Sequence, residues 1–350
     1  MLQIADIIQF SRENRFLPNL QRHQQNAMIL LSVDSPVKLC RLLKIPIPHL
    51  EAIINVPVYK HYTVKKKRGG ERHIFAPDKR LKDIQRRLNY FLQAYYLWIK
   101  PNEVHGFVIN PRYLDAHCNI VANACVHTGK KHILNIDLKD FFPGISAKRI
   151  KNLFTSHFFN YNEQIAIALT LLTTYESKLP TGAPTSPVLS NFVCYQLDTG
   201  LRNFCQENAL QFSRYADDLT FSSDVFISQD TIQHIKQLIE KNGFKVNEKK
   251  VRLQSSNRKQ TVTGLTVNEK VNVDRKLLKK IRAMLHDLTT NGVVSATKRH
   301  FNLEEFADFK EQERFIHRLK GYIDFVGQVR GKNTLYRNLK QSFESFLGYS

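Results

Sequence analysis

The chain has 350 residues, 42% hydrophobic and 24% charged, a composition that excludes a disordered tail and allows a sizeable core. Its 52 Lys and Arg against 31 Asp and Glu leave a net charge of +21, which indicates a polyanionic partner and first of all nucleic acid. Without an apolar run of about 18 residues, a secretory signal or a lipidation motif, we expect a cytoplasmic protein with no membrane partner.

The first part of the chain is expected to form helices and a basic hairpin. Apolar spacing predicts short helices up to about residue 55. The stretch 65–74, with Gly69 and Gly70 between β-rich flanks, predicts a hairpin with a cationic tip. Such a tip can hold phosphates, although a solvated Lys/Arg loop explains the same charges. A helical pattern follows over 81–99.

The middle of the chain alternates strands and helices. A strand is predicted over 132–138, and Ser186 is predicted as the N-cap of a later helix, with Pro187 at its first position. Strands 210–216 and 218–223 follow, then a helix that ends at Gly243, then a short strand. The order β, α, β, β, α, β is the split βαβ arrangement, which predicts a four-stranded antiparallel sheet backed by helices.

Carboxylates cluster in this pattern. Asp217 and Asp218 of a Tyr-Ala-Asp-Asp string lie at the bend of the predicted hairpin, and Asp137 lies on the strand face opposite Leu134 and Ile136. In the split βαβ topology the first strand and the hairpin are neighbours, so these carboxylates can meet. They suit a site for two Mg²⁺ ions roughly 3.5–4 Å apart that catalyses in-line phosphoryl transfer. In isolation, an Asp-Asp pair is also an ordinary turn.

Beyond residue 273 the pattern is helical and basic. An apolar stripe from Leu277 to Leu288 predicts one packed helix face, while Lys276, Lys279 and Lys280 project elsewhere. The basic face suits a nucleic-acid duplex, and a merely solvated face is the alternative.

With these motifs in order, the chain resembles the reverse transcriptases, and among them the bacterial retron reverse transcriptases. The resemblance covers residues 60–345. It rests on the Gly-Gly-x-Arg-x-Ile segment, Asp137 to Phe142, Leu179 to Asn191, the Tyr-Ala-Asp-Asp turn and Gly243 to Lys250. Two further strings, Asn123-Ala124-Cys125-Val126-His127 and Val262-Thr263-Gly264, match motifs that mark the retron enzymes.

The resemblance implies an α+β right-hand polymerase. Its parts would be N-terminal helices and fingers over 1–110, a ferredoxin-like palm over 111–268 with inserted fingers elements at about 145–185, and a helical thumb over 269–350. Asp137, Asp217 and Asp218 would be the catalytic metal ligands, for two Mg²⁺ ions with Mn²⁺ as a substitute.

The resemblance also implies binding residues. Those for the incoming dNTP are Lys65, Arg72, Phe142, Thr181, Gly182 and Lys250. Phe142 would exclude a 2′-hydroxyl, although a core aromatic is the plain alternative, and Lys249 is an alternative to Lys250. Thr181 departs from the Gln of many relatives. The implied RNA contacts are Asn123, His127, Val262, Thr263, Gly264, Lys276, Lys279 and Lys280.

The implied function is RNA-directed DNA synthesis on one cognate structured non-coding RNA, primed from an RNA 2′-hydroxyl. The product would be branched multicopy single-stranded DNA, joined to RNA and serving anti-phage defence with an effector protein. Alternatives are an intron-encoded, diversity-generating or abortive-infection reverse transcriptase, or a catalytically silent RNA-binding scaffold. We expect no ribonuclease H domain after residue 345.

Overall fold

The computed structural model describes residues 3–13, 19–66, 69–115, 117–304 and 306–347. The chain divides into two compact units: Met1–Asn119 with Leu134–Arg252, and Ile120–Ile133 with Leu253–Ser350. Part of the predicted cationic tip, Lys67 and Arg68, lies outside the described residues. The boundaries proposed for fingers, palm and thumb stay a prediction.

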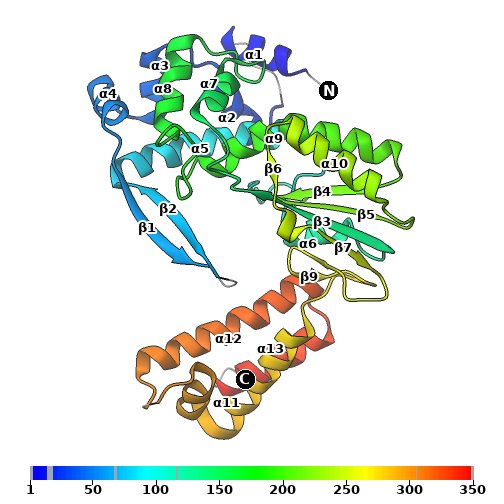
Figure 1. Ribbon diagram of the computed structural model, residues 1–350. Coiled ribbons are helices and arrows are strands. Elements are labelled where there is room, and N and C mark those ends of the chain that lie inside the picture. The colour runs from blue at the N-terminus through cyan, green and yellow to red at the C-terminus, as the bar shows by residue number, and fades with distance from the viewer. Residues whose placement is uncertain (1–2, 14–18, 67–68, 116, 305, 348–350) are drawn as a thin grey trace. The chain divides into compact units, whose positions relative to one another are not determined.

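The first unit begins with the expected short helices and hairpin. The helices are α1 (Ile4–Arg12), α2 (Arg22–Leu31), α3 (Pro36–Leu43) and α4 (Ile47–Asn55). Strands β1 (Tyr59–Lys65) and β2 (Glu71–Pro77) pair antiparallel and form the arm that projects beyond the helices of this unit in Figure 1. Helix α5 (Lys79–Ile99) follows, begun by Asp78, whose carboxylate accepts from the Leu81 amide.

The sheet of the first unit has the predicted topology. Its strands are β3 (His132–Lys139), β4 (Gln211–Tyr215), β5 (Asp218–Ser223) and β6 (Lys245–Val246). They lie in the order β4-β5-β3-β6, the order of a split βαβ sheet, and β7 (Arg252–Ser255) also pairs with β3. The first strand and the hairpin are therefore neighbours, as the carboxylate prediction requires.

Helices connect and cover this sheet. They are α7 (Ala147–Thr155), α8 (Glu163–Thr173), α9 (Ser186–Glu207) and α10 (Gln229–Lys241). In Figure 1, α9 and α10 lie together on one face of the strands. Helix α10 ends at Lys241 with Asn242 as its C-cap, and Gly243 follows with a φ of 74°, as predicted.

The predicted N-cap of α9 is wrong by one residue. Ser186 is the first helical residue and Thr185 is the cap. The Ser186 hydroxyl instead donates to the Pro180 carbonyl at 2.7 Å, so it closes the preceding turn rather than the helix end.

The second unit joins a short helix and strands to a helical bundle. Its elements, apart from β7, are α6 (Ile120–Cys125), β8 (Thr261–Val262), β9 (Leu265–Thr266), α11 (Arg275–Phe301), α12 (Phe309–Arg330) and α13 (Thr334–Phe346). The apolar stripe of α11 packs as predicted, with Ile281 and Leu288 fully buried beside Phe315 and Leu319 of α12. Within the described residues, no helix is long and apolar enough to cross a bilayer.

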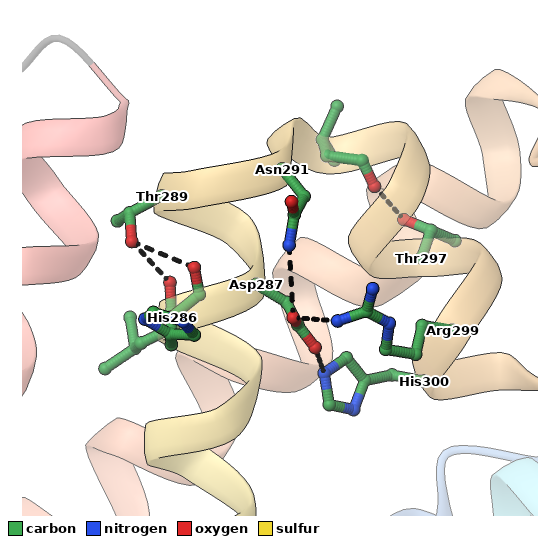
Figure 2. Close-up of polar contacts among 9 residues, drawn as sticks. His286, Asp287, Thr289, Asn291, Thr297, Arg299 and His300 are labelled. Atoms are coloured by element: carbon green, nitrogen blue, oxygen red, sulfur yellow. Dashed lines mark hydrogen bonds and ion pairs between the residues drawn. The ribbon is translucent and has the colours of Figure 1, made fainter.

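Helix α11 is kinked at Gly292, which has a φ of 72°. Figure 2 shows how Asp287 bridges the kink: its carboxylate accepts from Asn291, Arg299 and His300, with His300 Nε2 at 2.7 Å. The carboxylate is nearly buried, so these donors satisfy it and fix the bend.

Candidate active site

The two adjacent carboxylates lie at a tight hairpin bend. Tyr215 of β4 pairs with Asp218 of β5, which leaves Ala216 and Asp217 as the loop. Ala216 has a φ of 59°, a left-handed conformation that costs an L-residue roughly 1–2 kcal/mol. Such a bend persists only where its surroundings hold it in place.

A buried polar network supplies this support. Arg214 is fully buried, and its guanidinium donates to Asp198 of α9 at 2.6 and 2.7 Å, to Asn191 Oδ1 at 2.9 Å and to the Ala216 carbonyl at 3.1 Å. Burial alone would lower the pKa of Arg214, but the Asp198 carboxylate more than offsets this and raises it. A permanently charged donor therefore holds the Ala216 carbonyl, just before Asp217 and Asp218.

The segment before residue 108 closes the back of the bend. Gly106 lies so close that a Cβ there would be 2.3 Å from the Ala216 nitrogen. Asn191 Nδ2 donates to the Gly106 carbonyl at 3.0 Å, and the His105 amide donates to the Arg214 carbonyl at 3.0 Å. The backbone at 105–106, the Asn191 side-chain amide and the Arg214–Asp198 ion pair together support the turn from behind.

Asp137 is held between the hairpin and β6. The amide of Leu138, its neighbour, donates to the Asp217 carbonyl at 2.9 Å, and the Asn247 amide donates to the Asp137 carbonyl at 2.8 Å. Both carboxylate oxygens of Asp137 have partners: Lys250 Nζ at 2.6 Å and Asn247 Nδ2 at 3.0 Å. Of the two neighbouring lysines, Lys250 is therefore the one that contacts the Asp137 carboxylate.

The three carboxylates influence one another electrostatically. Burial raises the pKa of Asp218 to about 6, and the charges of Asp217 and Asp137 add to this effect. Burial also raises the pKa of Asp217, again with a contribution from Asp137, while Lys250 and Arg72 oppose the rise. Crowded, partly desolvated carboxylates favour the binding of a cation.

The side chains nevertheless do not form a closed ligand set. Among the described residues, no group of three or more His, Cys, Asp or Glu is arranged to hold a metal ion. The cation on Asp137 is the Lys250 ammonium. The carboxylates of Asp137, Asp217 and Asp218 still fit a hard divalent ion, which prefers carboxylate oxygens. They lie at one edge of the sheet, and their negative charges together exceed the positive charge of Lys250.

The predicted nucleotide-binding residues all lie in the first unit. Arg72 is exposed on β2, near enough for its charge to lower the pKa of Asp217, and Lys65 is exposed at the end of β1. The Phe142 ring is partly exposed and stacks on Phe107 at 5.7 Å between centroids. It is therefore neither a fully buried core aromatic nor a free surface ring.

The loop with Thr181 and Gly182 packs on β2. The Thr181 carbonyl accepts from the Phe75 amide at 2.7 Å. Gly182 has a φ of 124°, and a Cβ there would be 2.9 Å from Ile74 Cγ2 and from the Phe75 carbonyl. Only glycine allows this close approach of loop and arm.

The predicted RNA contacts lie in the second unit, and three of them are buried there. Asn123, His127 and Val262 are all 0% exposed in the chain alone, and their contact with RNA stays a prediction. Thr263 and Gly264 reach the surface in the β8–β9 turn, with φ of 47° and 83°.

The turn of the Val262–Gly264 motif packs on the start of α6, just before Asn123. Thr263 Oγ1 donates to the Ile120 carbonyl of α6 at 3.2 Å. Lys276, Lys279 and Lys280 are exposed on α11, where Lys280 also lies over the Tyr322 ring at 5.3 Å. Direct contacts from these lysines and from the turn stay a prediction.

Sequence reasoning missed Gly106 and the Arg214–Asp198 pair. A signal for the pair was present, because Arg214 continues the buried alternation of Phe212 in β4 and Asp198 follows Leu197 in an apolar helix face. A charged residue at a position where the pattern requires an apolar one indicates a buried partner. Gly106 carries no such signal, since its neighbour is 110 residues away.

The fold and the site together are those of a right-hand polymerase. The family model described as reverse transcriptase (RNA-dependent DNA polymerase) matches residues 64–267. The chain is 35% identical over 289 residues to the retron Ec86 reverse transcriptase of Escherichia coli, covering 79% of this chain and 84% of that protein. It is 33% identical over 263 residues to the retron Mx65 reverse transcriptase of Myxococcus xanthus, covering 70% of this chain and 59% of that protein.

This chain therefore belongs to the bacterial retron reverse transcriptases, within the family of RNA-dependent DNA polymerases. Among solved structures, a telomerase from Candida albicans in complex with a fragment of telomeric RNA aligns with a TM-score of 0.48 and 10% identity. That alignment covers 85% of this chain and 64% of the telomerase chain, and it is too weak to add to the assignment.

Proposed function

We propose that this chain copies part of a cognate structured non-coding RNA into branched multicopy single-stranded DNA in the cytoplasm. Synthesis starts from the 2′-hydroxyl of an internal guanosine, and the RNA–DNA product acts with an effector protein in defence against phage. The observation that carries the catalytic part is the juxtaposition of Asp137 with the Tyr-Ala-Asp-Asp hairpin in a chain of this family.

Two Mg²⁺ ions, replaceable by Mn²⁺, are the proposed cofactor. When bound, they would activate the primer hydroxyl and neutralise the triphosphate and the leaving pyrophosphate. Asp137 and Asp217 would hold both ions and Asp218 would support them. Lys250 lies on Asp137 at 2.6 Å, so metal binding would release its ammonium toward the pyrophosphate.

The chain's other residues would orient the dNTP. Arg72 on the arm would bind the triphosphate, because its planar guanidinium matches phosphate oxygens, and Lys65 would add charge. The partly exposed ring of Phe142, fixed against Phe107, would exclude a 2′-hydroxyl. Thr181 and Gly182 would border the nucleotide from the loop that packs on β2.

The net charge of +21 supports a nucleic-acid partner. RNA would be recognised by shape, 2′-hydroxyls and phosphates, with Thr263, Gly264, Lys276, Lys279 and Lys280 as the proposed surface. Binding should then weaken steeply with salt, because each neutralised phosphate releases counterions.

The test is dNTP incorporation by the purified protein with its own transcript. Asp217→Asn removes one proposed metal ligand without changing side-chain size, and we expect incorporation to fall by at least about 10³-fold. Asp230→Asn, which removes an exposed carboxylate in the first turn of α10, is the matched control and should retain wild-type incorporation.

The same variant, tested in cells, and the isolated product separate the alternatives. A catalytically silent scaffold would protect cells from phage equally well with Asp217→Asn, and this outcome would refute the polymerase as the basis of defence. Isolation of a small DNA covalently joined to RNA would support the retron product. Incorporation that persists after chelation of divalent ions would refute the metal mechanism.

A further inference from the structure

A cavity of about 540 Å³ opens in the first unit, between α2, α5 and the segment 109–113. The residues that matter for its chemistry are Arg22, His23, Asn26, Tyr90 and Tyr113. None of the proposed catalytic or nucleotide-binding residues lines it. Its size falls in the range of about 300–1,000 Å³ that small-molecule sites occupy.

Two tyrosines give the cavity flat aromatic surfaces. Tyr90 is 47% exposed and Tyr113 is 48% exposed, so both rings are accessible to a ligand. Most of the lining is apolar, including Ala94 and Ile109. Half-exposed aromatic rings at an apolar opening are the surfaces on which unstacked nucleobases bind.

Hydrogen bonds fix both rings before any ligand arrives. The Tyr113 hydroxyl contacts the His23 amide at 3.2 Å and His23 Nδ1 at 3.3 Å, and the Tyr113 and His23 rings stack. Asn26 Nδ2 donates to the Tyr90 hydroxyl at 2.8 Å. Because the hydroxyl ends are tied, a ligand would lose little entropy in ordering the rings.

Charge selects among flat apolar ligands. Arg22 is exposed at the start of α2 and lines the same cavity, so a guanidinium that suits phosphate oxygens stands beside the rings. The whole chain carries +21. A base with its attached phosphate matches this combination better than an apolar side chain of a protein partner does.

We propose that this cavity binds one unstacked nucleotide of single-stranded nucleic acid, with the base against Tyr90 or Tyr113 and its phosphate on Arg22. The site is separate from the carboxylate centre. The proposal rests on the proposed function only in that a nucleic-acid polymerase brings single strands to this surface.

The segment that borders the cavity also borders the active site. It runs from Gly106, which lies against the catalytic turn, through Phe107, whose ring stacks on Phe142, to Tyr113. Gln93 Nε2 of α5 donates to the Phe107 carbonyl at 3.0 Å. A nucleotide in the cavity would therefore stiffen the segment that backs the turn.

Photo-crosslinking tests the site directly. The probe is a ten-nucleotide single-stranded RNA that carries one 4-thiouridine, and crosslinked peptides are mapped by mass spectrometry. We expect a crosslink on the peptide that contains Tyr90 or on the peptide that contains Tyr113. Absence of crosslinks from both peptides, with crosslinks elsewhere, would overturn the proposal. So would the finding that the cavity is occupied by a protein side chain and not by the RNA probe.

Variants give the energetic test with the same probe. Tyr90→Ala should weaken binding about 10-fold, since stacking on an aromatic ring contributes that much per base, whereas Tyr90→Phe keeps the ring and should bind within two-fold of wild type. Arg22→Gln should reduce the slope of log affinity against log salt by roughly 0.7. Equal affinity of wild type, Tyr90→Ala and Tyr113→Ala would refute the site.

The crosslink is also mapped in the Asp217→Asn background. A crosslink that persists there while incorporation is lost, or while incorporation proves absent even in wild type, supports the cavity site independently of the polymerase. Normal incorporation with no crosslink on either peptide removes the cavity proposal and leaves the polymerase standing.

Discussion

The closest packing in the site gives the sharpest prediction: Gly106→Ala should impair synthesis without unfolding the protein. The added Cβ would lie 2.3 Å from the Ala216 nitrogen, 2.9 Å from the Tyr215 carbonyl carbon and 3.0 Å from its Cα. Real Cβ contacts are essentially never shorter than 3.0 Å, so the two backbones must separate by at least 0.7 Å. These neighbours are backbone atoms, so no flexible side chain can yield instead.

Such a displacement falls on the loop that carries Asp217. A misplacement of about 1 Å can reduce a rate by 10²-fold, so we expect the single-turnover rate of dNTP incorporation to fall by about 30- to 100-fold. The assay is a rapid-quench measurement with saturating template–primer at several Mg²⁺ concentrations. The concentrations are varied because displaced carboxylates should also lower the affinity for Mg²⁺. Thermal unfolding recorded in parallel shows whether the variant is folded.

The matched control is Gly200→Ala, within α9 of the same unit, where an added Cβ meets nothing within 4 Å. Alanine in a helix interior is more favourable than glycine by roughly 0.5–1 kcal/mol, so this variant should be slightly more stable and equally active. If folded Gly106→Ala incorporates within three-fold of wild type, the inference that the 106 backbone fixes the turn is wrong.

Further predictions concern charge. Asp198→Asn should cost about 3–5 kcal/mol in urea unfolding, because it leaves the buried Arg214 charge without its counterion, while Asp230→Asn should cost under about 0.5 kcal/mol. Burial lowers the pKa of His105 to about 4, so folding stability should fall as pH drops from about 6.5 toward 4, and His105→Gln should flatten this loss in pH-dependent melts. The pKa of Asp218 is raised to about 6, so its charge opposes folding of the metal-free protein above that pH. Asp218→Asn should then be more stable by about 1 kcal/mol at pH 7, a value reduced because the part of this side chain that reaches solvent is screened, and equal to wild type near pH 4.

Strand periodicity and turn chemistry predicted the part of the site that depends on local sequence. Alternation of apolar residues identified the hairpin and placed Asp137 on a neighbouring strand, and the split βαβ order then brought the three carboxylates to one sheet edge. These inferences succeeded because the period of a strand and the order of elements are written in the chain itself.

The remainder depends on contacts that no local pattern records. Gly106 meets Ala216 across 110 residues, and Ser186 satisfies a turn carbonyl rather than its own helix end. Asn123 resembles an RNA contact by motif, yet its side chain is fully buried, and within the described part of the chain neither of its polar atoms has a hydrogen-bond partner. Burial of a polar residue is a tertiary property, which is why no local sequence pattern predicted it.

The buried ion pair behind the turn explains how a strained bend can be stable. Replacing a buried ion pair by apolar residues is often neutral or stabilising, so the Arg214–Asp198 pair is poorly explained by stability alone. Its donors have a second use: the same guanidinium binds the Ala216 carbonyl and Asn191, which in turn binds the Gly106 carbonyl. An apolar replacement would leave those acceptors without donors and the left-handed Ala216 without restraint. The pair therefore stabilises one position of the Asp217 and Asp218 carboxylates rather than the fold in general, which is where the proposed function requires fixed geometry.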